Sequence, residues 1–88
     1  MGQVAVLFRL MPQSVETDVK AMGEAVRQAV PTSVTVRGMQ IKDIAYGLRA
    51  LLVSVVMPDE GGVLTQTEAA LAKVPHVESV EVMEEGLL

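Results

Sequence analysis

The segment 48–57 constrains the fold of this 88-residue chain more than any other stretch. Only Arg49 and Ser54 in it are polar, and its β-branched residues favour a strand that is covered on much of both faces. Gly47, which can adopt a positive φ, precedes the segment, and Pro58, which cannot donate a hydrogen bond to a sheet, follows it. We therefore expect a central strand whose two ends are set locally.

The two faces of this strand can be assigned separately, because side chains alternate along a strand. We expect the core-facing side chains to be Leu51, Val53, Val55 and Met57. The opposite face carries Leu48, Ala50, Leu52, Ser54 and Val56. Since this second face is also mostly apolar, it points to a contact surface for a partner.

The N-terminal third of the chain predicts a strand followed by a helix. Residues 3–11 alternate between an apolar and a mixed face, which is typical of a strand. Ser14 is placed to cap a helix that Pro31 ends. The apolar side chains with helical spacing are Val15, Val19, Met22, Val26 and Val30. Gly23 lies within this helix, either because the helix crosses a strand closely there or because a glycine is simply tolerated.

The rest of the chain repeats the same order of elements. Residues 34–41 predict an edge strand with a bulge at Gly38, joined to the central strand by a loop near residues 45–47. Residues 59–62 are rich in turn formers, and a second helix is expected at 63–73. A short last strand at 77–82 and a tail at 83–88 complete the chain.

This order of strand, helix, strand, repeated once, predicts an α+β fold formed by residues 1–88 as a single domain. It is the ferredoxin-like split β-α-β sandwich, a four-stranded antiparallel sheet with two helices on one face. The other face stays open. We expect it to show Ala5, Leu7, Leu52 and Val56 beside Arg9 and Arg49. A weak homo-oligomer through this open sheet face is one expected use of it.

Composition excludes several classes of function. The net charge of −4 disfavours binding to nucleic acids and to anionic membranes, because both require a basic surface. With no cysteine, the chain forms no disulfide and no thiolate metal site, and it suits a reducing, cytoplasmic location. The longest apolar run is far shorter than the roughly 20 residues that span a bilayer. The expected partner is a protein.

Candidate catalytic groups are few. The single histidine, His76, has no cysteine or second histidine to join it at a metal or in a catalytic triad, so we expect a surface or packing role. The acids Glu78, Glu81, Glu84 and Glu85 are expected to form a solvated edge rather than an acid–base pair. We expect no catalytic residue, no metal and no cofactor.

Other small ferredoxin-like domains offer alternatives. An acylphosphatase and a metal chaperone lack support in these residues, and the stacking aromatics of an RNA-recognition module are missing because Phe8 and Tyr46 are the only aromatic residues. A small-ligand-sensing or oligomerisation module leaves no sequence signature and stays open.

Several segments together resemble one known family. Residues 43–51 with the valine-rich strand after them, residues 57–62, residues 77–82 and the opening strand are similar to the archaeal translation elongation factor 1-beta family. The resemblance implies a ferredoxin-like factor that promotes exchange of GDP for GTP on the GTPase elongation factor 1-alpha. Such a factor binds the GTPase, disturbs its Mg²⁺ and phosphate site, and stabilises the nucleotide-free state.

The resemblance also implies where the GTPase is bound. The candidate partner-binding residues are Tyr46, Gly47, Leu48 and Arg49 in one loop, and Glu84, Glu85, Leu87 and Leu88 in the C-terminal tail. Eukaryotic relatives end in a lysine followed by a leucine or isoleucine, whereas this chain ends in 84–88 without a lysine. Displacement of Mg²⁺ would then fall to Arg49 or to the acidic tail, or the domain would act by wedging the GTPase domains apart.

Overall fold

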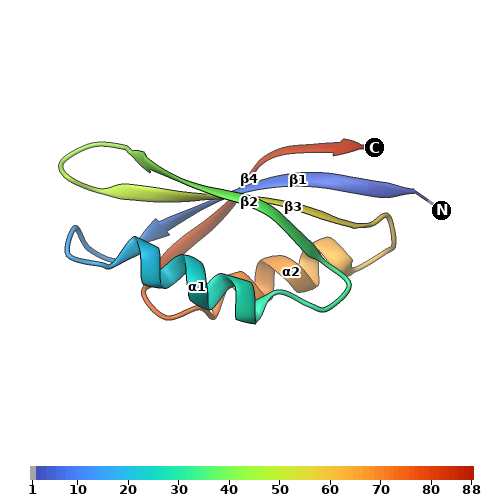
Figure 1. Cartoon of the computed structure of the whole chain (residues 1–88), viewed down its shortest axis with the longest axis horizontal. Coiled ribbons are helices and arrows are strands. Elements are labelled where there is room, and N and C mark those ends of the chain that lie inside the picture. The colour runs from blue at the N-terminus through green and yellow to red at the C-terminus, as the bar shows by residue number, and fades with distance from the viewer. Residues whose placement is uncertain (1) are drawn as a thin grey trace.

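The computed structural model describes residues 2–88 and contains six elements. In chain order they are β1 (Gln3–Pro12), α1 (Val19–Ala29), β2 (Thr35–Asp43), β3 (Arg49–Pro58), α2 (Val63–Ala72) and β4 (Val77–Leu87). The strands form one antiparallel sheet in the order β2-β3-β1-β4. Both helices lie against the same face of the sheet, and no described element covers the other face (Figure 1). The predicted ferredoxin-like architecture is confirmed.

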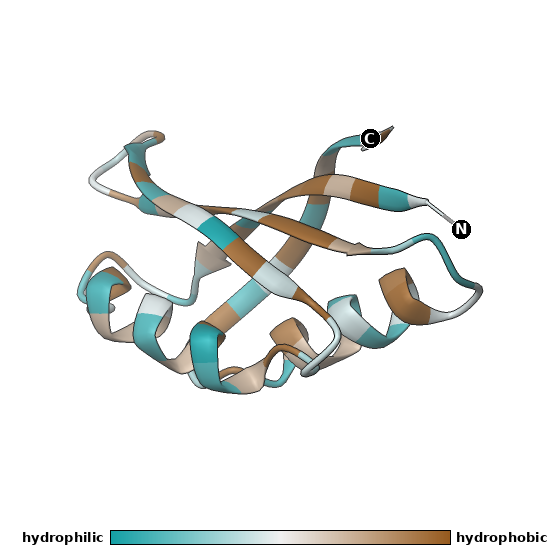
Figure 2. Ribbon diagram, turned by 45° about the vertical axis from the view of Figure 1, so that its right-hand side comes forward, coloured by the Kyte–Doolittle hydropathy of each residue, from teal (hydrophilic) through white to brown (hydrophobic). Residues whose placement is uncertain are grey.

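The two central strands supply most of the core. Their side chains alternate between the two faces, so that Val6, Phe8 and Leu10 on β1 are buried beside Val53 and Val55 on β3. Apolar colouring accordingly follows the strands at the centre of the sheet in Figure 2. From the helices, the buried apolar side chains that meet this layer are Val19, Met22, Val26 and Leu71. The core-facing set predicted for the segment 48–57 is confirmed.

Helix α1 begins later than the sequence predicts. Asp18, and not Ser14, is its N-cap, because the Asp18 carboxylate accepts hydrogen bonds from the backbone N–H groups of Lys20 and Ala21. Ser14 instead caps a tight turn, where its hydroxyl accepts from the N–H of Glu16 at 3.2 Å. Val15 therefore lies outside the helix and is 58% exposed.

Gly23 marks a close approach between α1 and the sheet. A Cβ added at this position would lie 3.1 Å from Sδ of Met39 on β2 and 3.7 Å from Cδ2 of Leu51 on β3. Of the two interpretations of this glycine, the close helix–strand crossing is the one that the structure shows.

The last strand is longer than predicted. Beyond residue 82 the chain stays paired with β1, with Glu84 opposite Leu7 and Leu87 opposite Val4. The predicted tail is therefore the second half of β4. The pairing shifts register beside Leu7, a local irregularity of the kind that a β-bulge produces. At the other edge of the sheet, β2 carries the expected bulge between Val36 and Gly38.

No helix among residues 2–88 is long and apolar enough to cross a membrane.

Candidate functional site

The hairpin between β2 and β3 carries the first group of predicted site residues. Its turn is closed by hydrogen bonds from the N–H of Leu48 to the carbonyl of Ala45 and from the N–H of Ile44 to the carbonyl of Leu48, both 2.9 Å. The two central residues, Tyr46 and Gly47, have φ values of 54° and 81°. Positive φ at both positions is the pattern of a type I′ turn, whose twist matches that of the flanking strands.

Tyr46 is the most exposed large apolar side chain that the structure describes at this hairpin. Its side chain is 97% exposed, so the fold gains almost nothing from burying the ring. Its left-handed backbone costs about 1–2 kcal/mol for a residue with a Cβ. A large aromatic side chain is thus exposed to solvent on a strained backbone. This combination points to a role in binding rather than in stabilising the fold.

The loop between β1 and α1 supports the hairpin. A Cβ added at Gly47 would lie 3.7 Å from Cγ1 of Val15, so the turn rests against this loop. A hollow of about 430 Å³ separates the two segments, and its lining includes Asp18, Lys20 and Arg49. The guanidinium Nε of Arg49 lies 3.4 Å from the Asp43 carboxylate, in a solvent-exposed ion pair.

Arg49 lies on the side of the sheet where the helices are, which corrects its predicted place on the open face. Arg49 lines the hollow beside the β1–α1 loop. Ala50 and Leu52, which lie an odd number of residues further along β3, belong to the opposite face. The physical reason is the strict period of two along β3, which puts Arg49 on the same face as Leu51.

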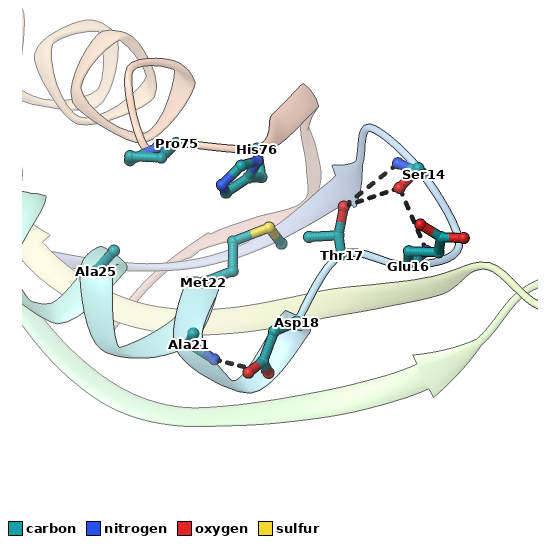
Figure 3. Close-up of a pocket in the computed structure, with 9 residues that line it drawn as sticks. All are labelled: Ser14, Glu16, Thr17, Asp18, Ala21, Met22, Ala25, Pro75 and His76. Carbon is teal, nitrogen blue, oxygen red and sulfur yellow. Dashed lines mark hydrogen bonds between the residues drawn. The ribbon is translucent and has the colours of Figure 1, made fainter.

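The loop from α2 to β4 completes this end of the molecule. His76 has a φ of 72°, and its carbonyl accepts a hydrogen bond from the N–H of Gln13 at 2.9 Å. Its ring and Pro75 face Met22 across a hollow of about 440 Å³ (Figure 3). Tyr46 and His76 are the two residues other than glycine with positive φ in the described chain, and both lie at this end. Sequence patterns gave no sign of the strain at His76.

The second group of predicted site residues lies on the second half of β4 and extends from the middle of the sheet to its other end. Leu87 and Leu88 are 75% and 67% exposed, and Glu84 and Glu85 are exposed as well. The N–H of Leu88 donates to the carbonyl of Gln3, next to the N-terminus. Nine residue steps along β3 separate the level of Arg49 from that of Pro58, which pairs with Gln3. The end of the chain is therefore about 30 Å from Arg49 along the strands, whereas Glu84, which pairs with Leu7 and so lies level with Ser54, is about 17 Å from it. The structure does not bring the two groups together.

The open face of the sheet lies between these two ends. Leu7, Leu52 and Met83 line a hollow of about 240 Å³ on it, together with Lys42 and Glu84. Arg9 also lines this hollow, and its Nη2 donates to Oε1 of Glu81 at 2.6 Å, while its Nε is buried without a hydrogen-bond partner. The apolar surface predicted for this face is present. The Arg9–Glu81 pair joins residues 72 positions apart, so no local pattern could have indicated it.

The described residues were compared with the arrangement that a metal ion requires. Within residues 2–88, no cluster of three or more histidine, aspartate or glutamate side chains is arranged to hold a metal ion. The exposed carboxylates of β4 stand singly along an edge strand. What the arrangement offers is a set of contact surfaces: a strained aromatic tip, an acidic and apolar strand end, and an open face.

Comparison with solved structures finds domains that have a similar fold. The ACT domain from the GTP pyrophosphokinase of Chlorobium tepidum superposes with a TM-score of 0.65 over 92% of this chain and 99% of that one. The C-terminal domain of the MgtC protein from Mycobacterium tuberculosis gives 0.58 over 99% and 88%. Sequence identities are only 15% and 18%, so these likenesses show the fold alone.

Sequence comparison is more specific. Residues 5–87 match the family model described as the EF-1 guanine nucleotide exchange domain. The chain is 43% identical to elongation factor 1-beta of Methanoculleus marisnigri over the full length of both chains. It is 39% identical to that of Methanosarcina acetivorans over 96% of each chain, and 36% identical to that of Haloarcula marismortui over the full length of both. This chain therefore belongs to the EF-1 guanine nucleotide exchange domain family.

Proposed function

We propose that this protein promotes exchange of GDP for GTP on elongation factor 1-alpha during translation elongation, and that it acts by binding. The observation that carries the proposal is the match of residues 5–87 to the EF-1 guanine nucleotide exchange domain, with relatives named elongation factor 1-beta aligned over the whole chain. The scarcity of catalytic groups fits this role, because nucleotide exchange makes and breaks no covalent bond.

Exchange by binding is a matter of coupled equilibria. The factor weakens nucleotide binding by binding the nucleotide-free GTPase more tightly than the loaded one, and nucleotide weakens factor binding by the same ratio. A thousandfold effect requires about 4 kcal/mol of differential binding. Groups that meet the GTPase at, or next to, its Mg²⁺ and phosphate site would supply this difference directly, and contacts that wedge the GTPase domains apart would supply it indirectly.

The hairpin offers two such groups. Tyr46 has the residue type and the full exposure of an interface anchor. Among the described residues, the ion pair found for Arg49 is the exposed one with Asp43, and such pairs contribute roughly 0–1 kcal/mol. The guanidinium can therefore exchange Asp43 for a carboxylate or phosphate of the GTPase at little cost.

The C-terminal end of β4 offers the second group. It presents Glu84 and Glu85 with Leu87 and Leu88, and no lysine. Arg49 lies about 17 Å from Glu84 and about 30 Å from the end of the chain along the strands, so one metal ion cannot be reached by both groups. We propose that one group acts near the metal and phosphates while the other holds a separate site on the GTPase.

The proposal is tested by measuring the affinity of the protein for elongation factor 1-alpha in two states, nucleotide-free and saturated with GDP and Mg²⁺. We expect the protein to bind the nucleotide-free state at least roughly tenfold more tightly. By linkage, this is the same factor by which the protein weakens the binding of nucleotide to the GTPase. Equal affinity for the two states would contradict an exchange function. A small-ligand sensor would instead show no GTPase binding and a melting temperature raised by its ligand.

A further inference from the structure

We propose that the hollow between the hairpin and the β1–α1 loop is a docking cleft for an apolar side chain of the GTPase that has a carboxylate beside it. This role rests on the proposed function, and it extends the contact surface to the β1–α1 loop, which holds none of the predicted site residues. The cleft has a volume of about 430 Å³. Its apolar lining consists of Pro12, Val15, Val19 and Ile41.

The β1–α1 loop holds Val15 in place without burying it. Val15 is 58% exposed and lies outside α1, so the fold gains little from its side chain. The turn around it is nevertheless fixed by the N–H of Thr17, which donates to the carbonyl of Ser14 at 3.2 Å. The N–H of Gln13 donates to the carbonyl of His76 at 2.9 Å and ties the start of the loop to the α2–β4 connection. An exposed apolar side chain on an ordered turn is preorganised for binding, because little conformational entropy remains to be lost.

The hairpin supplies the opposite wall of the cleft. Ile41 on β2 is 45% exposed and lines it, together with Gly47 and Arg49. The turn also touches the loop, because a Cβ added at Gly47 would lie 3.7 Å from Cγ1 of Val15. Gly47 and Arg49 thus belong both to the cleft and to the contact group that begins at Tyr46. A GTPase surface that covers the hairpin therefore covers the cleft as well.

The charges at the cleft define the chemistry of its occupant. The charged residues that line it are Lys20, Arg49 and Asp18. The Asp18 carboxylate is already engaged, because it accepts hydrogen bonds from two N–H groups in the first turn of α1. Two cations against one anion make the cleft locally positive, although the chain as a whole carries −4. An apolar side chain would contact Val15 and Ile41, and a carboxylate beside it would meet the guanidinium or the ammonium group.

The apolar part is tested by the affinity of Val15→Ser for nucleotide-free elongation factor 1-alpha. We expect binding to weaken by roughly tenfold, the effect of truncating one apolar anchor in an interface. The melting temperature should stay nearly unchanged, because Val15 is mostly exposed. Val82→Ser is the matched control, since Val82 is also partly exposed, at 37%, but lies on β4 away from the cleft. It should leave the affinity unchanged.

The charged part is tested with Lys20→Glu. This change places an acid in the first turn of α1, where the helix dipole favours it, so the fold should persist. We expect binding to weaken by roughly tenfold at about 50 mM salt and by much less at about 500 mM, because salt screens exposed charges. The loss caused by Val15→Ser should not depend on salt. Lys73→Glu, the same change in charge on an exposed residue outside the cleft, should have little effect.

A double variant distinguishes direct contact from support of the hairpin. If Val15 contacts the GTPase, the losses of affinity in Val15→Ser and Tyr46→Asn should multiply in the double variant. If Val15 acts only by holding the hairpin, the double variant should bind no more weakly than Tyr46→Asn alone. That result would overturn the docking cleft.

Two further results would contradict the cleft. Unchanged affinity of both Val15→Ser and Lys20→Glu would overturn it, while GDP release accelerated by the wild-type protein would leave the exchange function intact. A loss in Val15→Ser without one in Lys20→Glu at low salt would exclude the carboxylate. Conversely, a wild-type protein that binds the GTPase without accelerating GDP release would contradict the exchange function, and the affinities of the variants would still decide the cleft.

Discussion

At the hairpin, Tyr46 lowers the stability of the fold without gaining stability from burial of its side chain. Tyr46 adopts a left-handed backbone conformation that costs free energy, and its ring is 97% exposed. Asparagine tolerates this conformation better and is common in such turns. The identity of residue 46 is therefore not explained by the fold, and substitution can separate its conformational cost from its role in binding.

Tyr46→Asn should leave the free energy of unfolding unchanged or raise it by up to about 1 kcal/mol, measured by denaturant titration. The same variant should weaken binding to elongation factor 1-alpha by roughly 30-fold, the effect of removing an interface anchor worth about 2 kcal/mol. Tyr46→Phe keeps the ring and should retain most of the affinity. Unchanged binding by Tyr46→Asn would remove Tyr46 from the contact surface.

Gly23 is a second residue whose role can be isolated. Its absent side chain makes room for Met39 and Leu51, so Gly23→Leu should destabilise the protein by about 1–3 kcal/mol through overpacking. Gly23→Ala gains helix propensity of about 1 kcal/mol, and the flexible Met39 thioether can shift by the few tenths of an ångström required. Thermal unfolding should therefore show Gly23→Ala within about 1 kcal/mol of the wild type. Equal stability of the two variants would contradict the close crossing.

At the scale of elements, the start of α1 depends on Asp18. Asp18→Ala should lower the free energy of unfolding by about 1 kcal/mol, because two N–H groups of the first turn lose their acceptor. Ser14→Ala is the matched control, and it should cost less, because it affects a single turn hydrogen bond outside the helix. The reverse order of the two effects, in urea titrations, would place the cap at Ser14 after all.

The end of β4 gives a further prediction at this scale. Deletion of residues 84–88 should lower the melting temperature, because it removes backbone pairing with the first half of β1. The substitutions Glu84→Ala and Glu85→Ala keep the backbone and should leave the melting temperature nearly unchanged. They are therefore the variants with which to test the acidic residues in GTPase binding. A deletion without thermal effect would mean that the segment behaves as a free tail.

These two elements show what the sequence could and could not reveal. Alternation and helical spacing were sufficient for the four strands, the two helices and the core face. They failed at residues 14–18, where two residues suited to capping lie close together and Val15 fits the spacing of the helix stripe. They failed again at residues 84–86, where two acids and a glycine read as a tail, because pairing with β1 is not encoded locally.

The candidate site could likewise be predicted from the sequence only in part. The positive φ of Gly47 follows from residue type and is observed at 81°. The resemblance supplied the remaining site residues. No local sequence pattern could give the separation of the two groups, because that separation depends on strand register. The Arg9–Glu81 pair and the strain at His76 likewise depend on contacts between distant segments.

At the scale of the whole molecule, the fold is elongated, with a longest extent of 42 Å. One candidate contact group lies at the hairpin and the other along the second half of β4, and the open face of the sheet lies between them. This shape suits a factor that contacts two places on a larger partner at once. Arg49→Ala should slow exchange if the hairpin acts near the phosphates, and Glu84→Ala/Glu85→Ala should do so if the end of β4 does. Exchange rates measured across a range of Mg²⁺ concentration will identify the end that acts on the metal, since its variant should lose Mg²⁺ dependence. If neither variant slows exchange, both hypotheses for the metal site are wrong.

The most direct measurement is the release of a fluorescent GDP analogue from purified elongation factor 1-alpha at fixed Mg²⁺, with and without this protein. The proposed function predicts that release accelerates with increasing protein concentration until it saturates, and that Tyr46→Asn requires more protein to reach the same rate. Release that is unchanged by the wild-type protein, from a GTPase shown to bind and hydrolyse GTP, would contradict an exchange function.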